Sequence, residues 1–498
     1  MWEGIITGLA TALDPGNLAW VAFGCLAGTF IGMMPGLGPI TAIALMIPVS
    51  YSMEPAAGLI MMAGVYYGAV FGGSTSSILI NAPGVASTVA TSFDGYPMAR
   101  RGQAGRALAL AAFASFGGGT FGALALMLFA TSLASLAMQF QSPEYTLVLV
   151  FALSSIAAFA ERGKVLASLI SALAGLMLGT VGTDPSAGIQ RFTFGRADLA
   201  DGIGFVLLAM ATFALAEAFH MLVRGDSEPV PDRVGKRVRL HAGDARAIAP
   251  TVGRSSVLGF LVGVLPGAGA TLASFFAYDL QKRFRRGDEA DAARGVAAPE
   301  SANNAACTGS FVPLLTLGIP GSGTTAVLLG VMLSYGIQPG PRLLETEPAV
   351  FWGVIVSMYL GNLVLLALNL PLIPWLSRII HLKRRVLIPF VVAFSLLGVY
   401  LTSLNPFDVF LMLGFAIAAC ALRLNGFPMA PLLLGFILSP MLEENLRRTL
   451  LLSDGTLGVF VGAPLTIALL AACFLVWAVP ATRLLGALRS RNASRRRT

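Results

Sequence analysis

Apolar segments of membrane-spanning length recur along this chain. Residues 455–480 form one such run, and residues 203–221 form another that only one Glu and one His interrupt. A helix needs roughly 20 apolar residues to cross a bilayer core. Only 12% of the 498 residues are charged, against about 25% in soluble domains. A soluble fold could not bury so much apolar surface, so the sequence predicts an all-α polytopic membrane protein with about 10–12 transmembrane segments.

Clusters of positive charge mark the predicted cytoplasmic segments of the chain. No Lys or Arg occurs before Arg100, and the later ones gather in a few clusters. The positive-inside rule places these clusters in the cytoplasm. Predicted spans such as 107–136, 386–402 and 407–422 fit between the clusters and leave the C-terminus in the cytoplasm. Four arginines on the outer side depart from this pattern: Arg191, Arg196, Arg447 and Arg448.

A glycine-rich motif occurs twice in the chain. Residues 28–38 (GTFIGMMPGLG) return at 259–269 (GFLVGVLPGAG), with four glycines and one proline identical at a constant offset. Gly-Ser and Pro-Gly pairs follow in the same order, within 73–84 and again within 309–321. Motifs shared in one order predict two related structural repeats.

The loop charges predict that the two repeats have opposite orientations. In the first half the loop near 51–55 lacks positive charge and the loop near 100–106 is basic. In the second half the loop at 282–294 is basic, and the loop at 338–348 has one Arg against two Glu. Inverted repeats are common in secondary transporters. The predicted domains are a first membrane repeat at 1–223, a basic cytoplasmic linker at 224–250, a second membrane repeat at 251–480 and a basic cytoplasmic tail at 481–498.

Pro-Gly pairs interrupt the apolar segments of both repeats. Proline removes a hydrogen-bond donor and glycine adopts backbone angles that other residues avoid. Each pair therefore predicts a broken helix or a re-entrant hairpin whose tip lies inside the membrane. The arm that begins near residue 39 has only about ten apolar residues, too few to cross alone. Polar backbone at such a tip must face protein or a water-filled cavity.

The tips predict a binding site for an anionic substrate. The helix after each tip offers free N–H groups and the positive end of its dipole, and nearby hydroxyls add donors. A carboxylate could bind there without an arginine inside the bilayer. The predicted substrate-binding residues are Pro35, Gly36, Gly38, Asn81, Pro83, Gly84, Ser87, Thr88, Gly267, Gly269, Pro320, Gly321, Ser322, Gly323, Thr324 and Thr325.

Asparagine and hydroxyl oxygens near the same tips predict a site for a coupling ion. Such ligands suit Na⁺, the one cofactor that the residues suggest. The predicted coupling-ion residues are Ser74, Thr75, Asn81, Asn303, Asn304 and Thr308. Other interpretations stay open: the glycines suit helix packing, and the hydroxyls can bond to their own helix carbonyls. Glu300 is either an ordinary interfacial carboxylate or a proton or Na⁺ site.

Three stretches are informative as a combination: 32–38, 81–84 with its preceding Gly-Gly-Ser-Thr, and 299–305 running into 317–321. Together they resemble the large permease subunit of the tripartite tricarboxylate transporters, the TctA family. The resemblance implies a bacterial inner-membrane symporter that imports a di- or tricarboxylate on a Na⁺ or H⁺ gradient. It also implies two partners, a small membrane subunit and a periplasmic solute-binding protein. HExxH, GxSxG and Walker A motifs are absent, so no enzyme is predicted.

Two other functions fit the residues. One is an ion-coupled carrier for another small solute that works without a binding protein. The other is a channel, which would conduct without saturation and would not need paired polar tips. If the tips ride on a moving block, we also expect a homodimer, by analogy with carriers built in that way.

Overall fold

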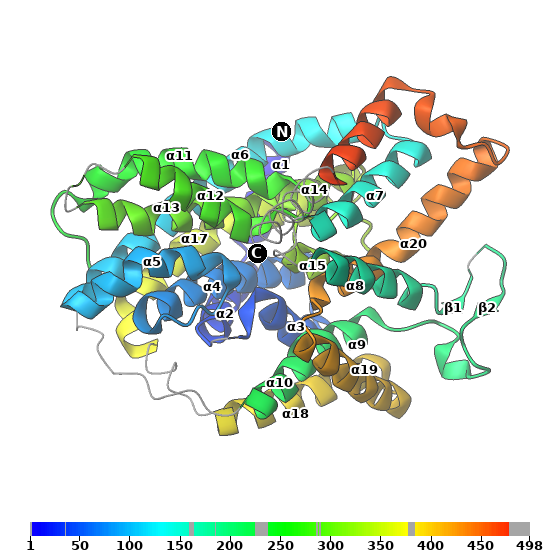
Figure 1. Cartoon of the computed structure of the whole chain (residues 1–498), viewed down its shortest axis with the longest axis horizontal. Coiled ribbons are helices and arrows are strands. Elements are labelled where there is room, and N and C mark those ends of the chain that lie inside the picture. The colour runs from blue at the N-terminus through cyan, green and yellow to red at the C-terminus, as the bar shows by residue number, and fades with distance from the viewer. Residues whose placement is uncertain are drawn as a thin grey trace, which may run out of the picture. The chain divides into compact units, whose positions relative to one another are not determined.

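The computed structural model describes residues 2–477 except for 35, 159–163, 185, 225–237, 285–286, 288–289 and 377–383. The described chain is mainly helical (Figure 1) and divides into two units. Unit 1 comprises Met1–Ala137 with Gly204–Ala421, and unit 2 comprises Met138–Ile203 with Leu422–Thr498. The predicted basic tail at 481–498 and residues 225–237 of the predicted linker lie outside the described residues.

Parts of both predicted repeats, 138–203 and 422–480, belong to unit 2, whereas unit 1 holds the repeated glycine motifs of both halves. Its first part contains α1 (Trp2–Ala12), α2 (Pro15–Gly32), α3 (Gly38–Ser50), α4 (Pro55–Ile80), η1 (Ala86–Thr88), α5 (Val89–Met98), η2 (Ala99–Gln103) and α6 (Ala104–Ala137). Its second part contains α9 (Phe205–Ala209), η4 (Met210–Leu215), α10 (Ala216–Arg224), α11 (Asp244–Val264), α12 (Gly269–Arg283), α13 (Asp291–Gly309), α14 (Phe311–Leu317), α15 (Gly323–Ser334), α16 (Leu343–Thr346), α17 (Pro348–Leu376), α18 (Arg384–Ser403) and α19 (Pro406–Leu424).

Unit 2 contains helices and one small hairpin. Its elements are α7 (Ser142–Ala158), α8 (Val165–Leu178), β1 (Gly182–Thr183), β2 (Gln190–Arg191), η3 (Ala197–Leu199), α20 (Met429–Leu452), η6 (Leu457–Val461) and a last helix at Pro464–Trp477. β1 and β2 pair antiparallel, with Gly182 opposite Arg191.

Seven helices within the described residues are long and apolar enough to cross a membrane. α6, α18 and α19 cover the spans predicted at 107–136, 386–402 and 407–422. α3 and α15 are apolar but shorter, as expected for an arm that does not cross alone. These lengths support a polytopic all-α membrane protein.

Glycines bring α2 and α4 into backbone contact. A Cβ placed on Gly28 would lie 2.2 Å from the carbonyl oxygen of Val65, and one on Gly32 would lie 2.1 Å from that of Ala69. From the other side, a Cβ on Gly72 would lie 2.2 Å from the carbonyl oxygen of Thr29. The small-xxx-small spacing therefore serves close helix packing here, as one of the two open interpretations predicted.

The second repeat uses the same contacts between α11 and α13. A Cβ on Gly259 would lie 2.3 Å from the carbonyl oxygen of Ala302, and one on Gly263 would lie 2.3 Å from that of Ala306. Both glycines are the motif counterparts of Gly28 and Gly32. Figure 1 shows α11, α12 and α13 (green) beside one another. The sequence repeat thus corresponds to a repeated helix pair in the structure.

In the second repeat, a hydrogen bond shows the relative direction of the two helices α11 and α12 that flank the break. Thr251, near the start of α11, donates from Oγ1 to Gln281 Oε1, near the end of α12, at 3.1 Å. The two ends therefore lie on the same side, and α12 returns along α11. Of the two predicted forms, a broken helix or a re-entrant hairpin, this segment adopts the hairpin.

Helices of the two repeats also pack against each other. α6, from the first repeat, packs along α13, and α17, from the second, packs along α4. A Cβ on Gly118 of α6 would lie 2.2 Å from the carbonyl oxygen of Ser301. The core of unit 1 is therefore shared between the repeats.

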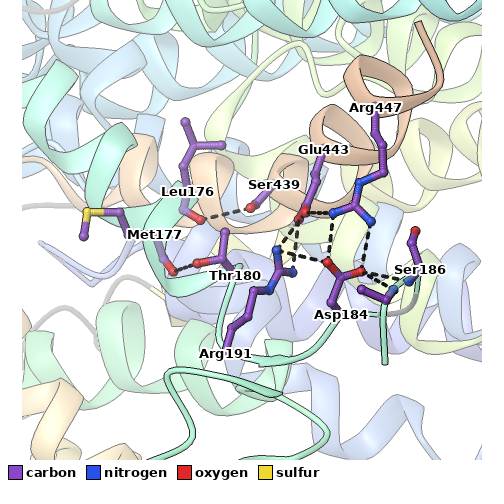
Figure 2. A network of polar contacts seen from close by, with 10 residues as sticks. Leu176, Met177, Thr180, Asp184, Ser186, Arg191, Ser439, Glu443 and Arg447 are labelled. Atoms are coloured by element: carbon purple, nitrogen blue, oxygen red, sulfur yellow. Dashed lines mark hydrogen bonds and ion pairs between the residues drawn. The ribbon is translucent and has the colours of Figure 1, made fainter. Parts of the chain in front are cut away.

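An ion-pair network joins the β1–β2 segment to α20 within unit 2 (Figure 2). Arg447 Nη2 lies 2.8 Å from Asp184 Oδ2 and 2.8 Å from Glu443 Oε1, and Arg191 Nη1 lies 2.7 Å from Glu443 Oε1. Hydrogen bonds from Arg447 and from the N–H of Ser186 hold the pKa of Asp184 well below its usual range. Two arginines that departed from the topology pattern are thus positioned by carboxylates.

The other two exceptions are also ion-paired. Arg196 Nη2 lies 3.3 Å from Asp198 Oδ2, and Arg448 Nη2 lies 2.8 Å from Glu444 Oε1. All four exceptions therefore have a local carboxylate partner.

Candidate functional site

The first break of each repeat depends on two glycines with positive φ. Gly36 and Gly38 have φ values of 94° and 56°, and their counterparts Gly267 and Gly269 have values of 80° and 62°. Residues with a Cβ rarely adopt this left-handed region, so the predicted need for glycine at both tips is confirmed. The predicted site residue Pro35 lies outside the described residues.

The second break of each repeat turns before the Pro-Gly pair. α4 ends at Asn81 with a φ of 52°, and α14 ends at Gly318 with a φ of 70°. Asn and Gly are the residue types that best tolerate a left-handed helix end. Gly84 serves close packing, because its added Cβ would lie 2.0 Å from the carbonyl oxygen of Gly32. Asn81 is exposed, so its visible role is to end α4.

Within each repeat the two tips lie against each other. The N–H of Gly267 donates to the carbonyl of Gly321 at 3.0 Å. In the first repeat, a Cβ on Gly38 would lie 3.7 Å from the carbonyl oxygen of Gly84. α3 packs against α15, and α12 packs against η1. The elements beside the tips therefore join the two repeats in one region of unit 1.

Many hydroxyls near the tips bond to backbone. Thr88 Oγ1 donates to the carbonyl of Val85 at 2.8 Å, and Thr325 Oγ1 donates to the carbonyl of Ser322 at 3.0 Å. The N–H of Thr325 donates to Ser322 Oγ at 3.2 Å, which completes a capping box at the start of α15. The predicted coupling-ion residues Ser74, Thr75 and Thr308 also bond to carbonyls of their own helices.

The remaining predicted residues of these tips occupy the tip loops and the first turn of α15. Pro83 is half-buried in the loop after α4, and Pro320 is buried in the loop after α14. Gly323 and Thr324 begin α15, and Thr324 is buried. The first turn of this 12-residue helix is where the sequence placed an anion.

Three predicted site residues have a buried polar atom without a hydrogen-bond partner among the described residues. These atoms are Ser87 Oγ, Asn303 Nδ2 and Asn304 Oδ1. Both asparagines are fully buried on α13, and Asn304 uses its Nδ2 to donate to the carbonyl of Glu300 at 3.0 Å. An unpartnered buried polar atom is costly and calls for a ligand or water. Ser87 Oγ and Asn303 Nδ2 can donate to an anion, and Asn304 Oδ1 can accept a hydrogen bond or bind a cation.

Glu300 is the central polar residue that the site prediction left out. Its side chain is 0% exposed. Ser74 and Ser115 donate to Oε2 at 2.8 Å each, and Thr91 donates to Oε1 at 2.5 Å. The three hydroxyls come from α4, α6 and α5. No cation of the described residues pairs with this carboxylate. Protein therefore covers this carboxylate on all sides, and an ionised carboxylate in such a position is costly unless it is paired.

The sequence carried a partial signal for this cluster. Glu300 stands in the run 299–305 and Ser74 is a predicted ion ligand, but Thr91 and Ser115 lie outside the motifs that predicted the site. Only the packing of α5 and α6 against α13 brings them to Glu300.

Aromatic rings line α4 beside the polar cluster. Tyr66, Tyr67 and Phe311 stack with ring centroids 5.8 to 6.3 Å apart. Tyr67 Oη donates to Thr308 Oγ1 at 3.3 Å, and the Tyr66 hydroxyl lies beside Ser310 and Ser322. These tyrosines link α4 of the first repeat to the polar tip of the second.

Seven membrane-length helices, with repeated breaks beside buried polar atoms, define a polytopic membrane protein of the transporter class. The chain belongs to the tripartite tricarboxylate transporter TctA family, whose sequence profile matches residues 18–434. This family membership confirms the resemblance that the motifs carried. It makes the chain the membrane subunit of a tripartite system, which has partner subunits, and it assigns the chain to a family of transporters rather than enzymes.

Two relatives occur in Agrobacterium vitis. One, described as an uncharacterized 52.8 kDa protein in the TAR-I ttuC′ 3′ region, is 44% identical over 482 residues, which cover 96% of each chain. The other, described as an uncharacterized protein in the TAR-II ttuC′ 3′ region, is 44% identical over 231 residues, which cover 45% of this chain and 96% of the relative. No solved structure gives a significant match.

Proposed function

We propose that the chain is the permease subunit of a binding-protein-dependent secondary transporter that imports a di- or tricarboxylate on a Na⁺ or H⁺ gradient. One observation carries the proposal: the fully buried carboxylate of Glu300 lies among hydroxyls, beside the repeated helix breaks. A buried carboxylate without a cation partner is costly when ionised. Binding of H⁺ or Na⁺ removes that cost, which is the property a coupling site needs.

The cation side of the site is made of oxygen ligands. The Oε atoms of Glu300, with the hydroxyls of Ser74, Thr91 and Ser115, form a compact set of oxygens. Asn304 adds the unpartnered Oδ1 on the next turn of α13. Na⁺ prefers such ligands, and a proton would need Glu300 alone. Both coupling ions are therefore compatible with the residues, and Na⁺ would be the one cofactor.

The anion side of the site lies at the tips. Ser87 Oγ and Asn303 Nδ2 are buried donors without partners among the described residues. The first turn of α15 adds the positive end of a helix dipole. A substrate carboxylate would bind these groups without an arginine, and its charge would be balanced by the ion at Glu300. This arrangement couples the two binding events electrostatically.

The remaining features of the proposal follow from the family and from charge. We place the chain in the bacterial inner membrane with a cytoplasmic C-terminus, and we assign the two repeats opposite orientations. Its partners would be a small membrane subunit, a periplasmic solute-binding protein and a second copy of the chain.

The direct test is uptake of radiolabelled citrate, tartrate and dicarboxylates into vesicles that contain this chain, its small subunit and its binding protein. We expect saturable uptake that requires an inward Na⁺ or H⁺ gradient. Asn304→Leu should abolish the uptake while the protein remains folded in size-exclusion chromatography. Uptake without the binding protein would identify an independent carrier, and uptake without saturation would identify a channel; either outcome contradicts the proposal.

A further inference from the structure

A basic pocket lies away from the tips, at the end of the α11–α12 hairpin. Its volume is about 160 Å³, and its lining includes Arg246, Pro250, Thr251, Arg254, Phe284 and Arg294. These residues come from the start of α11, the end of α12 and the start of α13. The pocket is large enough for a phosphate group, and the positive-inside rule places the hairpin ends at the cytoplasmic surface.

Two of the arginines are held in place by neighbouring residues. The Arg254 guanidinium lies over the ring of Phe284, with its carbon 4.4 Å from the ring centroid. Its Nη2 donates to Thr251 Oγ1 at 3.2 Å and also to Gln281. The position of this guanidinium is therefore fixed by stacking and hydrogen bonds, as in sites where arginine recognises carboxylates or phosphates.

Arg294 is held from the other side of the pocket. Its side chain is 11% exposed, and its Nη1 lies 3.1 Å from Asp291 Oδ1. Its Nε donates to the carbonyl of Ala247 at 3.4 Å. Arg246 adds a third, exposed guanidinium. The lining thus has three positive charges, one of which is ion-paired with Asp291.

An apolar stripe leads away from this pocket along α11. Val257, Leu261 and Leu265 are 45%, 61% and 49% exposed. They follow Pro250 and Arg254 at spacings of three and four residues, so Pro250, Arg254, Val257 and Leu261 lie on one face of the helix. Leu265 directly follows the end of the helix. α11 is one of the membrane-length helices. A free anion would not use such a stripe, whereas acyl chains would pack along it.

We propose that this pocket binds the headgroup phosphate of an anionic phospholipid in the cytoplasmic leaflet, with its acyl chains along the Val257–Leu261–Leu265 stripe. Basic pockets between helices on this side of a membrane bind such headgroups. The opposite face of α11 carries the glycines that pack on α13, and its end forms a substrate-site tip. The lipid would thereby brace the hairpin from its outer side.

The test measures lipid binding directly and does not depend on transport. The purified full-length protein is delipidated in detergent and titrated with phosphatidylglycerol, phosphatidylcholine or inorganic phosphate, with bound lipid counted by native mass spectrometry. We expect phosphatidylglycerol to bind at least about tenfold more tightly than phosphatidylcholine. The double variant Arg246→Gln/Arg254→Gln should lose at least about tenfold in affinity, because each charged contact contributes more than a factor of ten.

Two further variants keep the test specific. Arg101→Gln removes an exposed arginine outside the pocket lining and should bind phosphatidylglycerol like the parent protein. Leu261→Ser removes an exposed apolar contact and should weaken lipid binding in a folded protein. Equal affinity for phosphatidylcholine, or parent-like binding by the double variant, would overturn the site. Equal affinity for inorganic phosphate would overturn the lipid assignment.

Discussion

The carboxylate of Glu300 accepts hydrogen bonds from three helices at once. Ser74, Thr91 and Ser115 supply the donors, and each also belongs to a helix that packs near α13. Three neutral hydroxyls stabilise a buried charge only in part. The charge state of this one residue therefore affects how α4, α5 and α6 are held together, and under the proposed coupling role it would link ion binding to helix packing.

Glu300→Gln should uncouple transport from its driving gradient. The amide keeps the size of the side chain but can neither bind a proton nor place a negative charge beside Na⁺. We expect gradient-driven uptake to fall at least about tenfold, the effect of losing one charged contact of about 1.4 kcal/mol or more. Uptake is measured in vesicles as a function of Na⁺ and pH.

The matched control for this substitution is Glu345→Gln. Glu345 is exposed in α16, so its neutralisation should leave uptake unchanged. Full gradient dependence in the Glu300 variant would remove Glu300 from the coupling site. Misfolding of that variant would show as aggregation in size-exclusion chromatography and is distinguished by the more conservative Glu300→Asp.

Sequence patterns predicted the residue types at the site better than their contacts. The unpartnered atoms of Ser87, Asn303 and Asn304 all belong to predicted residues. The sequence predicts Asn81 as an ion ligand because its amide oxygen lies near a tip and suits Na⁺, yet the residue is exposed at a left-handed helix end. A local motif cannot separate these two uses of asparagine, because the difference depends on which helix covers it.

At the scale of elements, the sequence repeat corresponds to two helix pairs that pack closely through glycines. The packing of α2 on α4 and of α11 on α13 follows directly from glycines at conserved motif positions of the two halves. Apolar length was enough to predict long spans such as 107–136, 386–402 and 407–422, and Pro-Gly pairs predicted the first breaks; about 10–12 spans were expected, and seven helices of membrane length occur in the described residues. The turn at Gly318, three residues before Gly321, was not predictable, since either glycine could have adopted the positive φ.

Gly263→Ala should destabilise the protein, whereas Gly253→Ala in the same helix should not. A Cβ at position 263 would lie 2.3 Å from the Ala306 carbonyl oxygen, so α11 and α13 must separate. We expect a cost of about 1–3 kcal/mol. Nothing lies within 4 Å of a Cβ at position 253, so that change should add roughly 0.5–1 kcal/mol of stability. Thermal unfolding in detergent measures both, and equal melting temperatures would contradict the packing role.

Asp184→Asn should loosen the attachment of the β1–β2 segment to α20, in which the Arg191–Glu443 pair remains. The pKa of Asp184 lies well below its usual range, so the aspartate stabilises the folded state fully above the ordinary Asp pKa. This contribution is lost only as pH falls below about 3.9 and through the lower folded value. We expect the parent segment to resist limited proteolysis from about pH 7 down to about pH 4, and the variant to be cleaved faster throughout that range. Parent cleavage that rises already between about pH 7 and pH 5 would contradict the network.

At the scale of the whole molecule, each repeat contributes a helix to the packing of the other. Under the proposed transport function, this shared packing would allow one binding site to open to either side of the membrane. α6 of the first repeat packs on α13 of the second, and α17 of the second repeat packs on α4 of the first. Each half is therefore in contact with a helix of the other. Two related halves of opposite orientation can exchange roles when one rocks against the other, which is the usual basis of alternating access. The proposed transport mechanism therefore depends on whether the two repeats have opposite orientations in the membrane.

Counterpart loops of the two repeats should react with thiol reagents from opposite sides of the membrane. The native cysteines Cys25, Cys307, Cys420 and Cys473 are buried, which keeps their background low. Single cysteines are introduced as Ser52→Cys and Glu345→Cys in loops without excess positive charge, and as Arg101→Cys and Arg283→Cys in basic loops; all four positions are exposed. A membrane-impermeant maleimide added to intact cells with a permeable outer membrane should label only the first two.

The basic pair should be labelled after the inner membrane is opened or in inverted vesicles. Ser52 follows α3 and Arg283 ends α12, its counterpart, so opposite labelling of these two positions is what an inverted repeat requires. Labelling of both from the same side would mean parallel repeats. In that case the two tips could not approach the substrate from opposite faces, and a rocking mechanism built on repeat symmetry would have to be abandoned.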